Sequence, residues 1–155
     1  MFPAFRFAAL AVCWFAWSEP ARCADPTADA EPAILARIKA PHFAERDFPI
    51  TDFGANTEAD CSDAITKAIA ACHAAGGGRV VVPVGVWATG AVHLRSNVNL
   101  HLAEGATLRF SAEPAKYLPV VLTRFEGIEC MNFSPLIYAF EQENVAITGK
   151  GTLDG

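Results

Sequence analysis

The sequence has no cluster of lysine and arginine, and its 12 basic residues are outnumbered by 17 acidic ones. The formal net charge is −5 at pH 7. Proteins that bind nucleic acid need a concentrated basic face to neutralise phosphates, so DNA and RNA are not expected as partners. An acidic chain can still bind an anionic ligand, but only through a few local basic groups.

Spacings typical of metal ligands are also lacking. The four histidines are scattered, and no Cys-x-x-Cys, His-x-His or His-x-x-x-His occurs. We therefore predict no metal and no other cofactor. His93 and His101 fall on the polar phase of alternating segments, which predicts solvated surface side chains.

The five cysteines do not have the pattern of a disulfide framework. Cys61 and Cys72 bracket a predicted helix, which places them about 16 Å apart, beyond the ~7 Å reach of a disulfide. Cys130 could pair with one of them. We favour the alternative that all three are small buried hydrophobic residues.

No hydrophobic run is long enough to cross a bilayer as a helix. Residues 7–17 (FAALAVCWFAW) are apolar, follow Arg6 and end at a Ser-Glu-Pro break. This layout predicts a secretory signal peptide over residues 1–23, with an uncleaved membrane anchor as the alternative. Residues 24–46 are then a leader, and the expected location is secreted or periplasmic, without membrane attachment after cleavage.

Three glycines, Gly76–Gly78, stand between a predicted helix and a run of valines. Apolar residues recur at three- and four-residue spacing from Asp60 to Ala75, and Asp60 or Ser62 can cap the start of this helix. The first glycine suits a left-handed helix C-cap. A phosphate loop needs the reverse order, strand then glycines then helix. The glycines are therefore predicted to be structural.

Short strands with little helical periodicity follow the glycines. Turn residues separate predicted strand segments at 79–83, 87–94, 97–102, 106–110, 136–140 and 144–148. The stretch NVNLHLAEGATL from Asn97 is echoed by NVAITGKGTL from Asn144, with an offset of 47 that falls to 45 at Leu108 and Leu153. This echo favours a coiled repeat with the two stretches two rungs apart. The pattern alone leaves an antiparallel barrel or sandwich equally open.

Four stretches together resemble the opening of the polygalacturonase-like enzymes of glycoside hydrolase family 28. They are FPITDFGAN, DCSDAITKAIAACHAAGGGRVVVPVGVW, SNVNLHLAEGATLRFS and ENVAITGKGTLDG. LTRFEGIECMNFSPLIYAF, between them, is similar to the polygalacturonase branch in particular. The resemblance implies an all-β, right-handed parallel β-helix with the helix of residues 60–75 capping its N-terminal end. Residues 47–155 would then be the N-terminal part of a truncated glycosidase domain.

The same resemblance implies a secreted enzyme, monomeric at full length, that hydrolyses pectin- or galacturonan-type polysaccharide with inversion. Such enzymes use two carboxyl groups roughly 6.5–9.5 Å apart, one as acid and one to activate water. The family carries its aspartates in Asn-Thr-Asp and Asp-Asp motifs, followed by Gly-His-Gly, and none of these occurs here. Arg37-Ile38-Lys39 matches a further family motif but precedes the first strand, so we treat it as coincidence. The catalytic carboxylates are expected downstream of Gly155, and the 155 residues alone are expected to be inactive.

Arg124 and Glu126 flank Phe125 between predicted strands and are the candidates for a rim that contacts sugar. Arginine can hold a carboxylate through two hydrogen bonds. The competing interpretation, which we favour from the sequence alone, is a surface salt bridge beside a loop aromatic. Two other functions stay open, a calcium-dependent lyase on the same fold and a non-catalytic carbohydrate-binding β-helix.

Overall fold

The computed structural model describes residues 30–155. The predicted signal peptide, residues 1–23, lies outside the described residues. The chain divides after Lys39 into two compact units. The described part of the first contains the short helix α1 (Ala30–Leu35), and the second, residues 40–155, contains all the strands. Across residues 30–155, no helix combines the length and the apolar character needed to cross a membrane.

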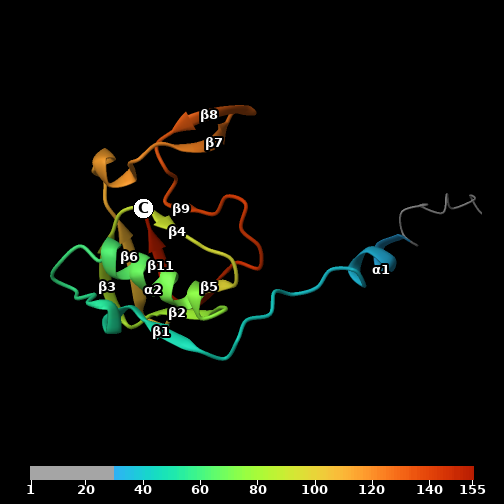
Figure 1. The fold of residues 1–155 in the computed structure, drawn as a ribbon, viewed down its shortest axis with the longest axis horizontal. Helices are drawn as coiled ribbons and strands as arrows, with labels where there is room; N and C mark the ends of the chain where they lie inside the picture. Colours follow the sequence, from blue (N-terminus) through green and yellow to red (C-terminus); the bar gives the residue numbers. More distant parts are fainter. Residues whose placement is uncertain (1–29) are drawn as a thin grey trace, which may run out of the picture. The chain divides into compact units, whose positions relative to one another are not determined.

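Most strands of the second unit pair in parallel with strands distant in the sequence (Figure 1). One sheet has the order β1–β2–β5–β10, a second has the order β11–β6–β3, and β4 pairs with β9. Every pair in these three sheets is parallel. The strands are β1 (Asp47–Pro49), β2 (Gly78–Val82), β3 (Gly85–Thr89), β4 (Val92–His93), β5 (Val98–Leu102), β6 (Ala106–Phe110), β9 (Ile137–Tyr138), β10 (Ala146–Gly149) and β11 (Thr152–Asp154). The predicted parallel β-helix is confirmed.

Alternate residues of each strand point into the coil and form stacked rows. Val80, Leu100 and Ile147 are register partners in β2, β5 and β10. Val80 and Leu100 are fully buried. Aliphatic residues at every second position therefore form a continuous core between rungs, as the period-two pattern of Val98–Leu102 requires.

The offset of the sequence repeat equals the separation between paired residues in the sheets. Ala146 pairs with Asn99, 47 positions earlier, and Leu153 pairs with Leu108, 45 positions earlier. The two stretches are therefore on adjacent rungs, and the prediction that they lie two rungs apart was wrong. An ordinary rung is short, since Val98 pairs with Gly78 only 20 positions earlier. The longer offset arises because the next rung contains an insertion.

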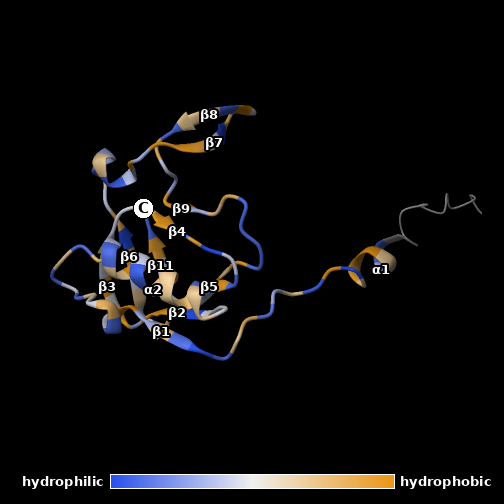
Figure 2. Ribbon diagram, in the orientation of Figure 1, coloured by the Kyte–Doolittle hydropathy of each residue, from blue (hydrophilic) through white to orange (hydrophobic). Residues whose placement is uncertain are grey.

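That insertion consists of the 3-10 helix η2 (Pro114–Tyr117) and an antiparallel hairpin, β7 (Val121–Phe125) with β8 (Ile128–Asn132). Its turn residues Glu126 and Gly127 have φ values of 48° and 88°, and positive φ at both central positions is what a type I′ turn requires. The turn lacks the Asn-Gly pair that most clearly marks a hairpin in a sequence. Figure 2 shows hydrophobic residues on this insertion, and Phe125 and Ile128 beside the turn are 62% and 71% exposed.

The predicted capping helix is α2 (Ser62–Ala74), and it packs on β1, β2 and the 3-10 helix η1 (Ile50–Phe53). Its buried stripe is Ala64, Ile65, Ala68, Ile69 and Cys72. At its start, Asp60 Oδ1 accepts the Ser62 N–H at 2.8 Å, while the N-cap residue itself makes no side-chain cap. At its end, Gly76 has a φ of 86°, and its N–H bonds the carbonyl of His73. The left-handed glycine terminus is therefore confirmed.

The cysteines of the second unit, Cys61, Cys72 and Cys130, are all free. Cys61 and Cys72 are buried, as predicted, whereas Cys130 is only half-buried. The prediction fails for Cys130 because it lies in β8, in a two-stranded hairpin that has no second layer to cover it.

Candidate functional site

A hollow of about 240 Å³ lies between the hairpin and the segment that begins with β9. It contains one cation, one carboxylate and two aromatic rings. Its lining residues are Leu122, Thr123, Arg124 and Glu129 from the hairpin, with Tyr138 and Phe140 opposite.

The two aromatic side chains form a fixed wall of this hollow. The rings of Tyr138 and Phe140 are stacked with nearly parallel planes, at an interplanar angle of 7° and with centroids 6.3 Å apart. The Tyr138 hydroxyl donates to the carbonyl of Leu122 at 2.7 Å, which ties β9 to the hairpin. The wall therefore presents flat apolar surface beside polar groups, an arrangement typical of ligand sites.

Arg124 and Glu129 are cross-strand register partners in the hairpin. Arg124 Nε donates to the carbonyl of Gly127 at 3.3 Å. In the described part of the chain the ion pairs are Asp47–Arg79, Asp154–Arg109, Asp60–Lys116 and Glu104–Lys150. Arg124 belongs to none of them, so its guanidinium is available to an external carboxylate.

The two residues proposed from the sequence are separated by the hairpin geometry. Arg124 lines the hollow, whereas Glu126 occupies the turn and is absent from the lining. The acid that lines the hollow is Glu129, which the sequence analysis missed. Recognition of a turn at Glu126-Gly127 would have predicted Glu129 as a site residue, because that turn makes Arg124 and Glu129 register partners.

His93 lies beside this wall on the exposed side of β4. Its Nε2 is 2.9 Å from the Ser134 hydroxyl, which in turn donates to the carbonyl of Pro135 at 3.0 Å. Because the hydroxyl hydrogen is used in that bond, His93 Nε2 is the donor. Burial lowers the pKa of His93 below its ordinary 6.5, so the neutral form is favoured. His101 is half-buried rather than solvated, with Nδ1 2.9 Å from the Thr148 hydroxyl.

A larger hollow of about 520 Å³ lies over residues 43–47, β2 and β5, but its one cation, Arg79, is already paired with an acid. Arg79 holds Asp47 through two hydrogen bonds of 2.7 and 2.8 Å. These bonds keep the pKa of Asp47 below its ordinary value. The pair stabilises the β1–β2 pairing and leaves little for a ligand. Within residues 30–155, no three His, Cys, Asp or Glu side chains gather as a metal site would require.

Similarity to known proteins covers most of the chain, although no family profile matches it. It is 35% identical over 116 residues, 68% of its length, to the exo-poly-alpha-D-galacturonosidase of Dickeya chrysanthemi. The exopolygalacturonase of Thermotoga maritima is 48% identical with a TM-score of 0.79 over 83% of the chain. The family 28 exopolygalacturonase of Yersinia enterocolitica is 32% identical with a TM-score of 0.61 over 72% of the chain. The chain spans 19%, 29% and 21% of these three proteins.

Proposed function

Because this chain is homologous over most of its length to the exopolygalacturonases of glycoside hydrolase family 28, we propose that it forms the N-terminal part of a polygalacturonan-cleaving glycosidase. The proposed reaction is inverting hydrolysis, by exo attack, of a pectin-type polysaccharide. The observation that carries the proposal is the 48% identity to the Thermotoga maritima enzyme, with a TM-score of 0.79 over 83% of the chain.

The catalytic carboxylates are proposed to lie in a part of the enzyme that residues 1–155 do not include. The sequence contains no Asn-Thr-Asp, Asp-Asp or Gly-His-Gly motif, and the chain spans 29% of the Thermotoga maritima enzyme. The capped coil would then serve as the platform on which later rungs stack.

The hairpin hollow is proposed to contact the sugar chain. Arg124 would hold a uronate carboxylate, while the wall of Tyr138 and Phe140 would pack against a sugar ring. Glu129 would accept hydrogen bonds from sugar hydroxyls. Secretion is proposed from the layout of residues 1–23, and cell fractionation followed by N-terminal sequencing of the mature protein tests it.

The direct test is a chimera. Residues 47–155 replace the aligned segment of the Thermotoga maritima exopolygalacturonase, and galacturonate release from polygalacturonate is measured. We expect an active chimera and an inactive 155-residue chain. A chimera that folds and binds substrate but releases no sugar would contradict the proposal and favour a non-catalytic binding protein. Activity of the 155-residue chain would contradict the placement of the carboxylates.

Arg124→Gln in the active chimera tests the role of the hairpin hollow. Loss of a hydrogen bond to a charged group costs about 1.5–3 kcal/mol, so KM should rise by about ten- to a hundredfold. Arg109→Gln is the matched control, because Arg109 pairs with Asp154 on strands β6 and β11 and is not part of the hollow. An unchanged KM for Arg124→Gln would exclude this contact.

A further inference from the structure

A third hollow, of about 310 Å³, lies between α2 and the segment that contains β4. One wall is a single face of α2, formed by Ser62, Thr66 and Ile69 at helical spacing. Ser62 Oγ accepts the N–H of Gly90 at 2.8 Å, which ties the helix to the chain that enters β4. This wall presents one free hydroxyl, that of the exposed Thr66, beside apolar surface.

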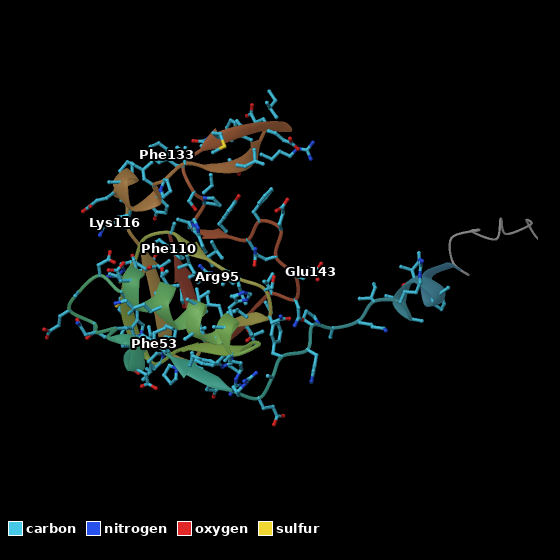
Figure 3. The ribbon with its side chains drawn as sticks, viewed as in Figure 1. Phe53, Arg95, Phe110, Lys116, Phe133 and Glu143 are labelled. Carbon is cyan, nitrogen blue, oxygen red and sulfur yellow. The ribbon has the colours of Figure 1, made fainter. Side chains whose placement is uncertain are left out.

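The opposite wall consists of outward side chains around β4. The N–H groups of Val92 and Leu94 donate to the carbonyls of Leu136 and Tyr138 at 2.9 and 2.8 Å. These two side chains are buried, so the alternation of the extended chain turns His93 and Arg95 outward into the hollow. Lys116 of η2 and Leu118, the residue after η2, complete the lining. Figure 3 labels Arg95 and Lys116.

The lining contains two cations and no acid. Lys116 Nζ lies 3.1 Å from Asp60 Oδ2, outside the lining, and this hydrogen bond raises the pKa of Lys116. Asp63 and Glu113 act on Lys116 from further away. Arg95 belongs to none of the ion pairs found in residues 30–155. Because a chain of net charge −5 gains no attraction for anions from its overall field, an anion would have to be held by local cations such as Arg95.

We propose that this hollow is a second uronate-binding site, distinct from the hairpin hollow. Arg95 holds the carboxylate through two hydrogen bonds, and Thr66 bonds a sugar hydroxyl, while Lys116 stays paired with Asp60 at the edge of the hollow. Its volume is at the lower end of the 300–1,000 Å³ typical of ligand sites, which suits a single sugar ring. A carboxylate ligand follows from the lining alone, whereas the choice of a uronate rests on the proposed function.

The rings of His93 and Tyr138 separate this hollow from the hairpin hollow. His93 lines this one, Tyr138 lines the hairpin hollow, and the centroids of their rings are 5.2 Å apart. Each hollow contributes one arginine, Arg95 or Arg124, that belongs to none of the ion pairs within residues 30–155. Polygalacturonate carries one carboxylate on every residue, so a single polymer chain can present carboxylates to both sides of this ring pair.

The test is binding of digalacturonate to the full chain, followed by backbone amide shifts and calorimetry. We expect shifts at residues 91–95 and 116–118 and a Kd that Arg95→Gln weakens by about ten- to a hundredfold. Arg109→Gln, an exposed arginine outside the hollow, should leave Kd unchanged. Arg124→Gln should reduce shifts at residues 122–140 and leave those at 91–95. The circular dichroism spectrum of each variant confirms that it is folded.

Three results would overturn the site. Shifts confined to residues 122–140 would leave the hairpin hollow as the sole uronate site. Equal shifts with inorganic phosphate or a neutral galactose disaccharide would exclude recognition of a uronate. Unchanged affinity in a folded Arg95→Gln variant would exclude the proposed contact. None of these results alters the chimera experiment, so failure of this site is distinguishable from failure of the proposed function.

Discussion

The rings of His93 and Tyr138 are in contact because the two residues are register partners in β4 and β9. Their planes are tilted by 55°, and His93 Nε2 is bonded to the buried Ser134. One pair of side chains thus joins two neighbouring rungs of the coil and separates the two hollows.

Mild acid should destabilise the protein through His93. Burial places the folded-state pKa of His93 below the unfolded value of 6.5, so the unfolded chain binds more protons as the pH falls. Its contribution to stability is complete above pH 6.5 and is lost as the pH falls through the folded pKa. His93→Gln should flatten the decline of Tm between pH 7 and pH 5. Identical slopes for parent and variant would contradict this account.

Gly77 should tolerate no side chain. Its φ is 105°, and an added Cβ would lie 2.5 Å from the carbonyl oxygen of Asn97. Gly77→Ala should therefore lower the free energy of unfolding by about 3 kcal/mol or more, from left-handed strain and overpacking together. Gly54→Ala is the matched control, because Gly54 has a φ of 93° but no atom within 4 Å of the added Cβ. Denaturant titration of both variants measures the difference, and equal losses would show that the clash is relieved.

The loss in free energy of unfolding when a core side chain is truncated should depend on the position of that side chain along the stack of rungs. Leu100 is 0% exposed, whereas its register partner Ile147 is 46% exposed. Leu100→Ala should cost about 2–5 kcal/mol, and Ile147→Ala about 1 kcal/mol or less. Both values come from urea unfolding of the 155-residue chain. A larger loss at Ile147 would mean that β10 is covered in solution.

Stronger acid should release the Asp47–Arg79 pair. Hydrogen bonds from Arg79 lower the folded-state pKa of Asp47 below 3.8, so its stabilisation is present above pH 3.8 and is lost as the pH falls through the folded value. Both side chains are about half exposed, with 46% and 45% accessible, so the effect should be below ~1 kcal/mol. Asp47→Asn should be less stable than the parent at pH 7 and equal to it near pH 2. A constant difference across that range would contradict the assignment.

Elements set by local periodicity were predictable from the sequence. The stripe of Ile65, Ala68, Ile69 and Cys72 defined α2, and the alternation at Val98–Leu102 defined β5. The echo between Asn97 and Asn144 contained the true register, because residues in equivalent positions on stacked rungs meet the same neighbours.

Features set by the insertion were not predictable from the sequence. A 47-residue offset is compatible with two short rungs or with one rung that carries a hairpin, and nothing local distinguishes them. Glu126 tolerates the left-handed φ of 48° that the turn needs, although glutamate is not a typical turn residue there. The hollow that contains Arg124 and Glu129, and the half-exposed Cys130, both follow from that hairpin.

Cross-strand contacts between backbone protons, measured by nuclear Overhauser spectroscopy on the isotope-labelled chain, test the stacked coil most directly. In parallel pairing the sequence separation of partners is constant along a strand, whereas in antiparallel pairing it changes by two at each step. The account predicts contacts at a constant separation of 47 between β5 and β10 and of 45 between β6 and β11. Separations that change stepwise along these strands would contradict it.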